Sequence, residues 1–188
     1  MPKLTTLTTL AAISDSDLLY IVTGSDGDYT SQVVQATKLL AHVGAHTAYG
    51  QISTEANSTG ITTTADTWIK ITTFDSDDYS YNTVNDVSGT ESQVLLDAVG
   101  TYKVELSVSA KCTQMKKLRV RVFVGGVEQS HITASEQILS TNQIHGMSAV
   151  GIITTAAVDE DVTAYVYVPN SDSTVTVTEA QLVITRLA

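Results

Sequence analysis

The sequence predicts an all-β fold, an antiparallel jelly-roll sandwich preceded by a small N-terminal hairpin and short-helix segment. β-Branched residues are abundant, with 29 Thr and 22 Val in 188 residues, and such residues prefer the pleated surface of a sheet. Charged residues make up only 16% of the chain, below the ~25% of an average soluble protein. From residue 68 onward apolar and polar residues alternate repeatedly, which is typical of half-buried antiparallel strands.

The first 45 residues are expected to form a separate anchoring segment. Two apolar runs, Leu18–Val22 and Tyr29–Val34, flank a Gly- and Asp-rich turn and predict a β-hairpin. Residues Ala36–His42 can form a short helix that Gly44 ends. The segment has too few apolar residues to offset its own ordering entropy, so it should need a partner surface. The side chains expected to bind that partner are Leu4, Leu7, Leu18, Leu19, Tyr20, Ile21, Leu39 and Leu40.

Residues 46–67 are mostly small and polar and predict a linker with a lead-in strand. The main domain, residues 68–188, is expected to open with a strand at Trp68–Ile71. Alternating apolar positions predict further strands over Tyr102–Ala110, Leu118–Val124, Val162–Val168, Val175–Val177 and Leu182–Ile184. The pair Gly125-Gly126 between Val124 and Val127 predicts a tight hairpin turn. A series of short strands separated by turns, with no helical pattern between them, predicts a sandwich or jelly roll.

Some positions expected to face outward are themselves apolar or aromatic. Phe123, Tyr165, Tyr167 and Ile153 occupy the face that a monomeric sandwich would usually keep polar. Exposed apolar surface of this kind marks an interface, and a closed symmetric assembly would cover it. Phe123, Tyr165 and Tyr167 are therefore the candidate subunit interface of a homo-oligomer.

Four segments of the main domain carry a family resemblance. The strand GTYKVELSVS at Gly100–Ser109 and the hairpin strand LRVRVFVGG at Leu118–Gly126 resemble the central strands of the C1q/TNF-like jelly-roll family. The later segments DEDVTAYVY at Asp159–Tyr167 and AQLVI at Ala180–Ile184 match its last strands. The resemblance covers about residues 60–188, and it implies a compact homotrimer whose two chain ends lie near one another at its base.

The N-terminal segment resembles a different family. Its order is Leu4-x-x-Leu7, the run SDLLYIV at Ser16–Val22, a polar turn, and a last segment Val-x-x-Thr-x-Leu-Leu at Val34–Leu40. This order is similar to the N-terminal module that attaches phage tail fibres to their particle. The resemblance implies a virion protein with an N-terminal anchor, which binds other virion proteins in the tail, near the portal or on the capsid, and a displayed C-terminal jelly roll.

Charge and hydropathy exclude several partner classes. The formal net charge is −10, which argues against nucleic acid as a ligand. Six of the ten basic residues nevertheless lie between Lys103 and Arg121, a cationic strip that is either a solvated strand face or a ligand patch. No apolar run reaches the ~20 residues of a membrane helix, so no membrane insertion is expected. The N-terminus lacks the pattern of a signal peptide, so we expect synthesis in the host cytoplasm and localisation to the virion.

The sequence gives no reason to expect an enzyme, a cofactor or a metal site. Cys112 is the single cysteine, and no motif links it to His131 or His145 as a nucleophile and base. His42 and His46 are four residues apart, but Gly44 interrupts a helix there, which leaves a metal on a trimer axis as the minor alternative. The acidic turns at Asp26–Asp28 and Asp75–Asp78 lack the length and terminal Glu of an EF-hand.

A polar loop between two strands is the candidate receptor site. It is expected over Ser130–Gly146, where a rigid scaffold could present polar side chains to a host-surface glycan or protein. Its candidate contact residues are His131, Gln137, Asn142, Gln143 and His145. The sequence thus predicts a short trimeric phage fibre or spike. The alternatives are a capsid decoration or head-fibre protein with no receptor role, a glycan-acting enzyme, and a cellular C1q/TNF-like adhesin.

Overall fold

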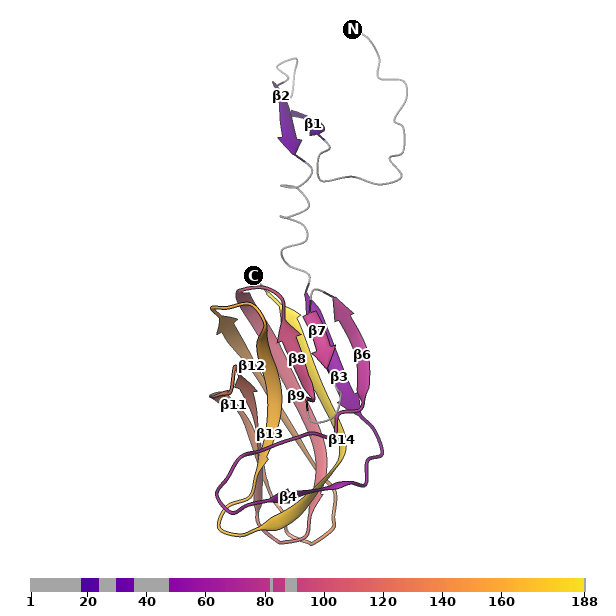
Figure 1. Cartoon of the computed structure of the whole chain (residues 1–188), viewed down its shortest axis with the longest axis vertical. Coiled ribbons are helices and arrows are strands. Elements are labelled where there is room, and N and C mark those ends of the chain that lie inside the picture. Colours follow the sequence, from indigo (N-terminus) through magenta and orange to yellow (C-terminus); the bar gives the residue numbers. More distant parts are fainter. Residues whose placement is uncertain (1–17, 24–29, 36–47, 82, 87–90, 188) are drawn as a thin grey trace. The chain divides into compact units, whose positions relative to one another are not determined.

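A computed structural model describes residues 18–23, 30–35, 48–81, 83–86 and 91–187 (Figure 1). The chain divides into two units, residues 1–46 and 47–188. In the first unit, β1 (Leu18–Thr23) pairs antiparallel with β2 (Thr30–Gln35), and Leu18 lies opposite Gln35. The predicted N-terminal hairpin is therefore confirmed.

Most other expectations for the N-terminal segment fall on residues outside the described ranges. The expected helix at 36–42 lies outside the described residues, as do the anchor candidates Leu4, Leu7, Leu39 and Leu40 and the histidines His42 and His46. The four remaining anchor candidates, residues 18–21, lie on β1. Their role as an anchor stays a prediction.

The second unit consists of two sheets, and every strand pair in its described residues is antiparallel. The first, called sheet I here, has the strand order β12-β9-β14-β3-β6, with β4 also paired to β14. Its strands are β3 (Tyr49–Thr54), β4 (Gly60–Thr63), β6 (Ser76–Tyr81), β9 (Gly100–Cys112), β12 (His145–Thr155) and β14 (Ser173–Arg186).

The second sheet, called sheet II, has the order β11-β10-β13-β8-β7, with β5 also paired to β13. Its strands are β5 (Ile69–Lys70), β7 (Thr83–Asp86), β8 (Gln93–Leu96), β10 (Lys117–Val124), β11 (Val127–Gln137) and β13 (Glu160–Tyr167). No helix in the described part of the chain is long and apolar enough to cross a membrane. The predicted all-β, antiparallel jelly roll is confirmed.

The core lies between the two sheets and follows the alternation in the sequence. On β9 every second residue from Tyr102 to Cys112 is buried, and on β10 every second residue from Leu118 to Val124 is buried. Tyr102 is the largest fully buried side chain; its hydroxyl donates a hydrogen bond to the Ala98 carbonyl (2.5 Å). Burial raises the pKa of Tyr102 above its ordinary value, so this phenol stays protonated and keeps its hydrogen bond.

The hairpin between β10 and β11 forms as expected. Gly125 and Gly126 have φ angles of 55° and 74°, a region that favours glycine because it has no Cβ. The two glycines bring Val124 opposite Val127. This turn places β11 at the edge of sheet II.

The stretch expected to be a linker is part of the sandwich. Residues 46–67 contain both β3 and β4, which are each hydrogen-bonded to β14. The residues that β3 buries are Ala48 just before it and then Gly50, Ile52 and Thr54. These side chains are mostly small or polar, so the buried face gave little hydrophobic pattern. The jelly roll therefore starts about 20 residues earlier than the expected opening at Trp68.

Two further expectations are corrected. Residues 173–186 form one strand rather than two, interrupted by a bulge between Val177 and Glu179. Ile153 points into the core and is 4% exposed, whereas its neighbour Ile152 is exposed. The β12 pattern buries Met147 and Ile153, so the outward side of this strand is the opposite of the one expected.

The start of the first strand of the jelly roll and the end of the last strand lie side by side at one end of the sandwich (Figure 1). The Arg186 N–H donates to the Ala48 carbonyl (2.7 Å), and β14 and β3 run side by side from Thr185 opposite Tyr49. The two ends of the jelly roll therefore lie side by side, and the trimer base at which the resemblance places the chain ends stays a prediction.

Candidate functional site

Outward-facing aromatic and arginine side chains gather on sheet II. Because Leu118, Val120 and Val122 point into the core, Arg119 and Arg121 between them point outward on β10. Tyr167 and Tyr165 on β13 lie opposite Arg119 and Arg121 in the register. Trp68 and Phe123 complete the group. These six residues, Trp68, Arg119, Arg121, Phe123, Tyr165 and Tyr167, are called the aromatic–arginine cluster below.

The rings of this cluster contact one another. The Trp68 ring centroid lies 5.0 Å from that of Tyr167 and 6.0 Å from that of Phe123, and the Phe123 and Tyr165 centroids are 4.1 Å apart. The Arg121 guanidinium carbon lies 4.7 Å from the Trp68 centroid, and the Arg119 guanidinium carbon lies 5.4 Å from the Tyr167 centroid. Both distances are within the range of cation–π attraction.

Hydrogen bonds fix two members of the cluster. Arg121 donates to Thr133 Oγ1 (2.6 Å) and to Glu128 Oε2 (2.5 Å). The Tyr167 hydroxyl donates to Asp66 Oδ1 (2.7 Å). That bond, together with one from the Asn170 backbone N–H, lowers the pKa of Asp66, and the Asp66 carboxylate raises the pKa of Tyr167. The cluster is therefore an ordered polar and aromatic surface.

The three residues expected at a subunit interface are all in this cluster. The structure brings Phe123, Tyr165 and Tyr167 together, but each is only partly exposed because the rings cover one another. No observation tests their place in a subunit interface, and because neighbouring rings and arginines already cover them, the assembly proposed below uses sheet I instead. The sequence-based reasoning missed Trp68, Arg119 and Arg121 as members; the only signal was the pair of arginines at alternate positions of one strand.

A second group of apolar side chains lies on the outward face of sheet I. Tyr49, Tyr79 and Tyr81 are 44%, 67% and 51% exposed, and Val150 and Ile152 are 60% and 56% exposed. The tyrosines lie on β3 and β6, at one edge of the sheet, and the aliphatic residues lie on β12, at the other. This surface is called the tyrosine–aliphatic face below.

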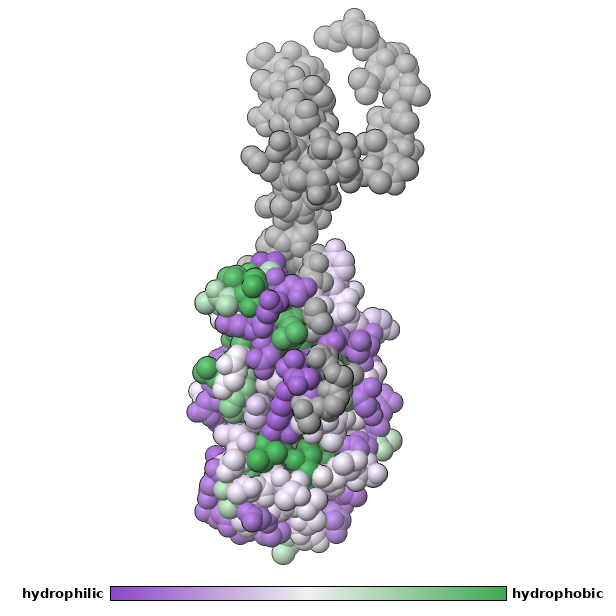
Figure 2. All heavy atoms as spheres, in the orientation of Figure 1, coloured by the Kyte–Doolittle hydropathy of each residue, from purple (hydrophilic) through white to green (hydrophobic). Residues whose placement is uncertain are grey.

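Polar groups separate the two edges of this face. The register aligns Ile152 with Lys103 and Val150 with Glu105 on β9. Lys103 Nζ and Glu105 Oε1 form an ion pair at 2.9 Å, and both side chains are well exposed. On the face of the jelly roll seen in Figure 2, hydrophobic residues form several small groups among hydrophilic ones rather than one continuous band.

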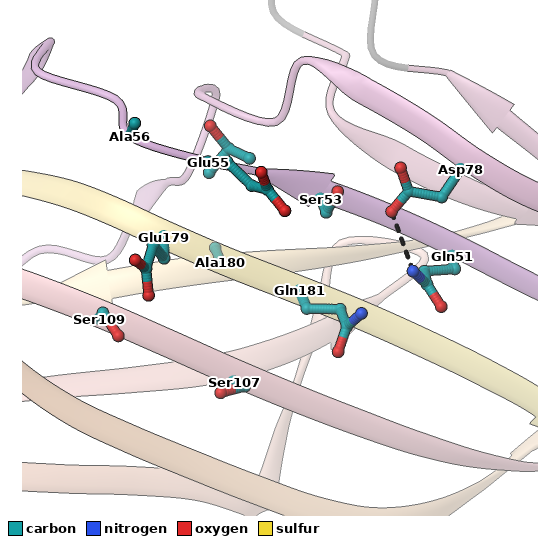
Figure 3. Close-up of a pocket in the computed structure, with 11 residues that line it drawn as sticks. Gln51, Ser53, Glu55, Ala56, Asp78, Ser107, Ser109, Glu179, Ala180 and Gln181 are labelled. Atoms are coloured by element: carbon teal, nitrogen blue, oxygen red, sulfur yellow. Dashed lines mark hydrogen bonds between the residues drawn. The ribbon is translucent and has the colours of Figure 1, made fainter.

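A shallow polar groove of about 590 Å³ also lies on sheet I (Figure 3). Gln51 Nε2 donates to Asp78 Oδ2 (2.9 Å), while Gln181 and Ser107 lie on neighbouring strands. Hydrogen bonds from Ser53, Ser76 and Gln51 hold the pKa of Asp78 below its usual value. Within the described residues, no group of three metal-ligating side chains comes together, here or elsewhere. The groove can offer hydrogen bonds to a ligand from its amide, hydroxyl and carboxylate groups.

The candidate receptor loop is shorter than expected. β11 extends to Gln137 and β12 begins at His145, so His131 and Gln137 lie on one strand and His145 on the other. Only Asn142 and Gln143 remain in the connecting loop. β11 is an edge strand that buries Ile132 alone, so its sequence shows almost no alternation and reads as a polar loop.

Cys112, His131 and His145, which were considered as a nucleophile and its base, each contact a different partner. The Cys112 thiol is buried, 2.9 Å from Ser173 Oγ. His131 Nε2 lies 3.0 Å from the Ile152 carbonyl, and His145 Nδ1 lies 3.8 Å from a Glu136 carboxylate oxygen. Each of the three groups thus has a local structural partner.

The two-sheet antiparallel sandwich is a jelly roll of the C1q/TNF-like kind. Among solved structures, the chain is similar to the Eiger TNF from S. frugiperda, with 9% identity, a TM-score of 0.52, and coverage of 76% of this chain and 94% of that one. It is also similar to the globular domain of zebrafish complement 1qA, with 12% identity, a TM-score of 0.51, and coverage of 76% and 98%. No family model and no curated protein matches the sequence. At these identities the likeness shows the fold.

Proposed function

We propose that this chain is a non-enzymatic structural and adhesive protein, a homotrimeric fibre or spike displayed on a tailed bacteriophage. The jelly roll associates with copies of itself, and residues 1–45 anchor the trimer to other virion proteins. The observation that carries the proposal is the tyrosine–aliphatic face, where Tyr79, Val150 and Ile152 are each more than half exposed. Val150 and Ile152 lie together on β12 and the tyrosines lie together on β3 and β6, and exposed apolar groups at the two edges of one sheet face mark an interaction surface.

A second copy of this chain is the occupant that fits the face. Its two apolar edges differ, with flat tyrosine rings on one and branched aliphatic groups on the other, so each edge complements the opposite edge of a neighbour. The Lys103–Glu105 pair beside one edge is balanced in charge and does not itself repel another copy, whereas Glu55, Asp78 and Glu179 along the groove carry negative charge that the contact must leave in water. The number three rests on the C1q/TNF-like fold, whose family resemblance implies a trimer.

The virion assignment rests on the N-terminal segment. Its order of short leucine repeat, hairpin and leucine-containing close resembles phage-fibre anchor modules, and the hairpin itself is present in the structure. The non-enzymatic assignment is supported by the bonding of the candidate groups: Cys112, His131 and His145 each contact a different structural partner. The protein would be made in the host cytoplasm and leave the cell with the particle.

Two measurements on the full chain test this function. Sedimentation equilibrium should give three times the chain mass of 20.0 kDa, and a monomer at micromolar concentration would exclude the trimer. Antibody labelling of particles in electron micrographs should place the protein at the tail. Label over the head would assign it as a decoration or head fibre, and particles without label would exclude a virion role. Hydrolysis of host polysaccharide by the purified trimer would overturn the non-enzymatic assignment.

A further inference from the structure

The outward face of sheet II concentrates positive charge in an acidic protein. Arg119 and Arg121 belong to the aromatic–arginine cluster, and Lys117 lies on the same side of β10, two residues before Arg119. Lys70 on β5 lies opposite Tyr165 and so shares that side. These are four of the ten basic residues in a chain of net charge −10. Three residues of the cationic strip, Lys117, Arg119 and Arg121, therefore share one local surface with Lys70, which is distant from them in the sequence.

The cations on this surface are of two kinds. Arg121 is held by Thr133 and Glu128 and packs on Trp68, so it positions the indole ring. Arg119 and Lys70, in contrast, form no ion pair within the described ranges of the chain. Glu128 and Asp66, two carboxylates at the border of the cluster, are engaged by Arg121 and by Tyr167 respectively. Arg119 and Lys70 are thus left to bind an external anion.

Aromatic rings lie between these cations. Trp68 and Tyr167 are both partly exposed, and their centroids are 5.0 Å apart. Their apolar faces can pack against the C–H faces of pyranose rings, while a guanidinium binds a carboxylate through paired hydrogen bonds. Outward residues on a strand recur about every 7 Å, so Lys117, Arg119 and Arg121 form a row of regularly spaced charges. A polymer of sugar rings with repeated carboxylates matches this combination.

We infer that the outward face of sheet II binds an acidic polysaccharide, with Trp68 and Tyr167 packing on sugar rings and Arg119 and Lys70 pairing with carboxylates. The inference rests on the proposed function, because a displayed virion protein meets such polymers at the host surface. The face lies on the opposite side of the sandwich from the tyrosine–aliphatic face. A trimer formed through sheet I would leave three copies of it open, and three linked sites strengthen binding to a long polymer.

The single tryptophan of the chain makes binding directly observable. Trp68 is the only tryptophan, so the emission excited at wavelengths that the eight tyrosines do not absorb reports on this face alone. The probes are polygalacturonate, alginate and polysialate, titrated into the full chain at low salt. At least one of them should change the Trp68 emission saturably, and added salt should weaken the effect. Methyl-esterified polygalacturonate, which has the same backbone without the charge, should bind much more weakly.

Matched variants locate the site. Arg119→Gln combined with Lys70→Gln should weaken binding about tenfold or more, since hydrogen bonds between charged groups are lost. Lys111→Gln is the control, because Lys111 lies on β9 of sheet I and its removal should leave the affinity unchanged. Trp68→Phe should abolish the fluorescence change, and sedimentation of labelled polysaccharide with the protein should then show a weaker but measurable affinity.

Three outcomes would overturn the inference. The first is no binding of any of the three acidic polysaccharides, and the second is binding of polyglutamate as tight as that of the polysaccharides. The third is a loss of affinity in Lys111→Gln as large as that in the Arg119→Gln, Lys70→Gln double variant. Equal binding of polyglutamate would assign the face to acidic peptides instead. The oligomeric state of the same samples separates this inference from the proposed function. A trimer that binds none of the probes refutes the polysaccharide site alone, whereas a monomer refutes the proposed assembly whether or not it binds.

Discussion

The two outward faces of the sandwich differ in how their apolar side chains are covered. On sheet II, Phe123, Tyr165 and Tyr167 lie against one another and against Trp68, and arginines cover two of the rings. On sheet I, Val150 and Ile152 stand exposed on β12. Both faces come from the same alternation along the strands. The difference teaches that apolar residues at outward positions indicate an interface only where no neighbour in the same chain already covers them.

The largest effect on folding is expected at the aromatic–arginine cluster. Trp68→Ala removes the ring that contacts Tyr167, Phe123 and Arg121. Because Trp68 is only partly buried, we expect the free energy of unfolding to fall by about 2 kcal/mol, less than for a core tryptophan. Chemical denaturation followed by circular dichroism measures this loss. Tyr79→Ala removes an exposed ring from the other face and, compared at protein concentrations low enough for the subunits to dissociate, should leave the stability almost unchanged. An equal loss in both variants would erase the difference between the faces.

A smaller effect is expected on association through sheet I. Val150→Ser removes an exposed branched side chain from the tyrosine–aliphatic face and should weaken each subunit contact by about 1 kcal/mol. The dissociation constant from sedimentation equilibrium measures this change. Val158→Ser is the control, because Val158 has a similar exposed fraction, 55% against 60%, but lies in the turn before β13. If both variants associate like the unmodified chain, Val150 lies outside the contact.

The smallest effect is a pH dependence at the margin of sheet II. The hydrogen bond from Tyr167 lowers the pKa of Asp66 below its ordinary value of 3.8. A depressed pKa in the folded state contributes stability that is present above the unfolded pKa and is lost as the pH falls through the folded one. Unmodified protein should therefore be slightly more stable than Tyr167→Phe at neutral pH, and the gap should narrow below pH 3.8. Thermal unfolding of both proteins between pH 7 and pH 3 measures the gap, and a constant gap would contradict this account.

Sequence reasoning identified the strands whose buried positions are occupied by large apolar residues. β9 and β10 bury large apolar residues such as Tyr102, Leu106 and Leu118, and the Gly125-Gly126 turn pairs β10 with β11. It missed strands whose alternation is masked. β3 buries Gly50 and Thr54 beside Ile52, and β11 buries Ile132 alone, so neither shows a two-residue hydrophobic period although both form full ladders.

The candidate site could be predicted only in part. The outward aromatics Phe123, Tyr165 and Tyr167 were found because their strands alternate clearly. That Trp68 covers them depends on β5 pairing with β13, a contact between segments about 100 residues apart that no local pattern encodes. The same holds for Ile152 and Ile153, which are adjacent in sequence. Which of the two faces outward is decided by the register of β12 on β9.

One measurement tests most directly the claim that subunits meet through sheet I and not through sheet II. Sedimentation velocity at micromolar concentration compares the full chain with Ile152→Asp and Phe123→Asp, and circular dichroism monitors their folding. An unpaired charge in an interface costs several kcal/mol, so Ile152→Asp should be a folded monomer, whereas Phe123→Asp should stay trimeric with reduced stability. Leu139→Asp, at an exposed loop position, should remain a stable trimer. A trimeric Ile152→Asp beside a folded, monomeric Phe123→Asp would contradict the account and place the contact on sheet II.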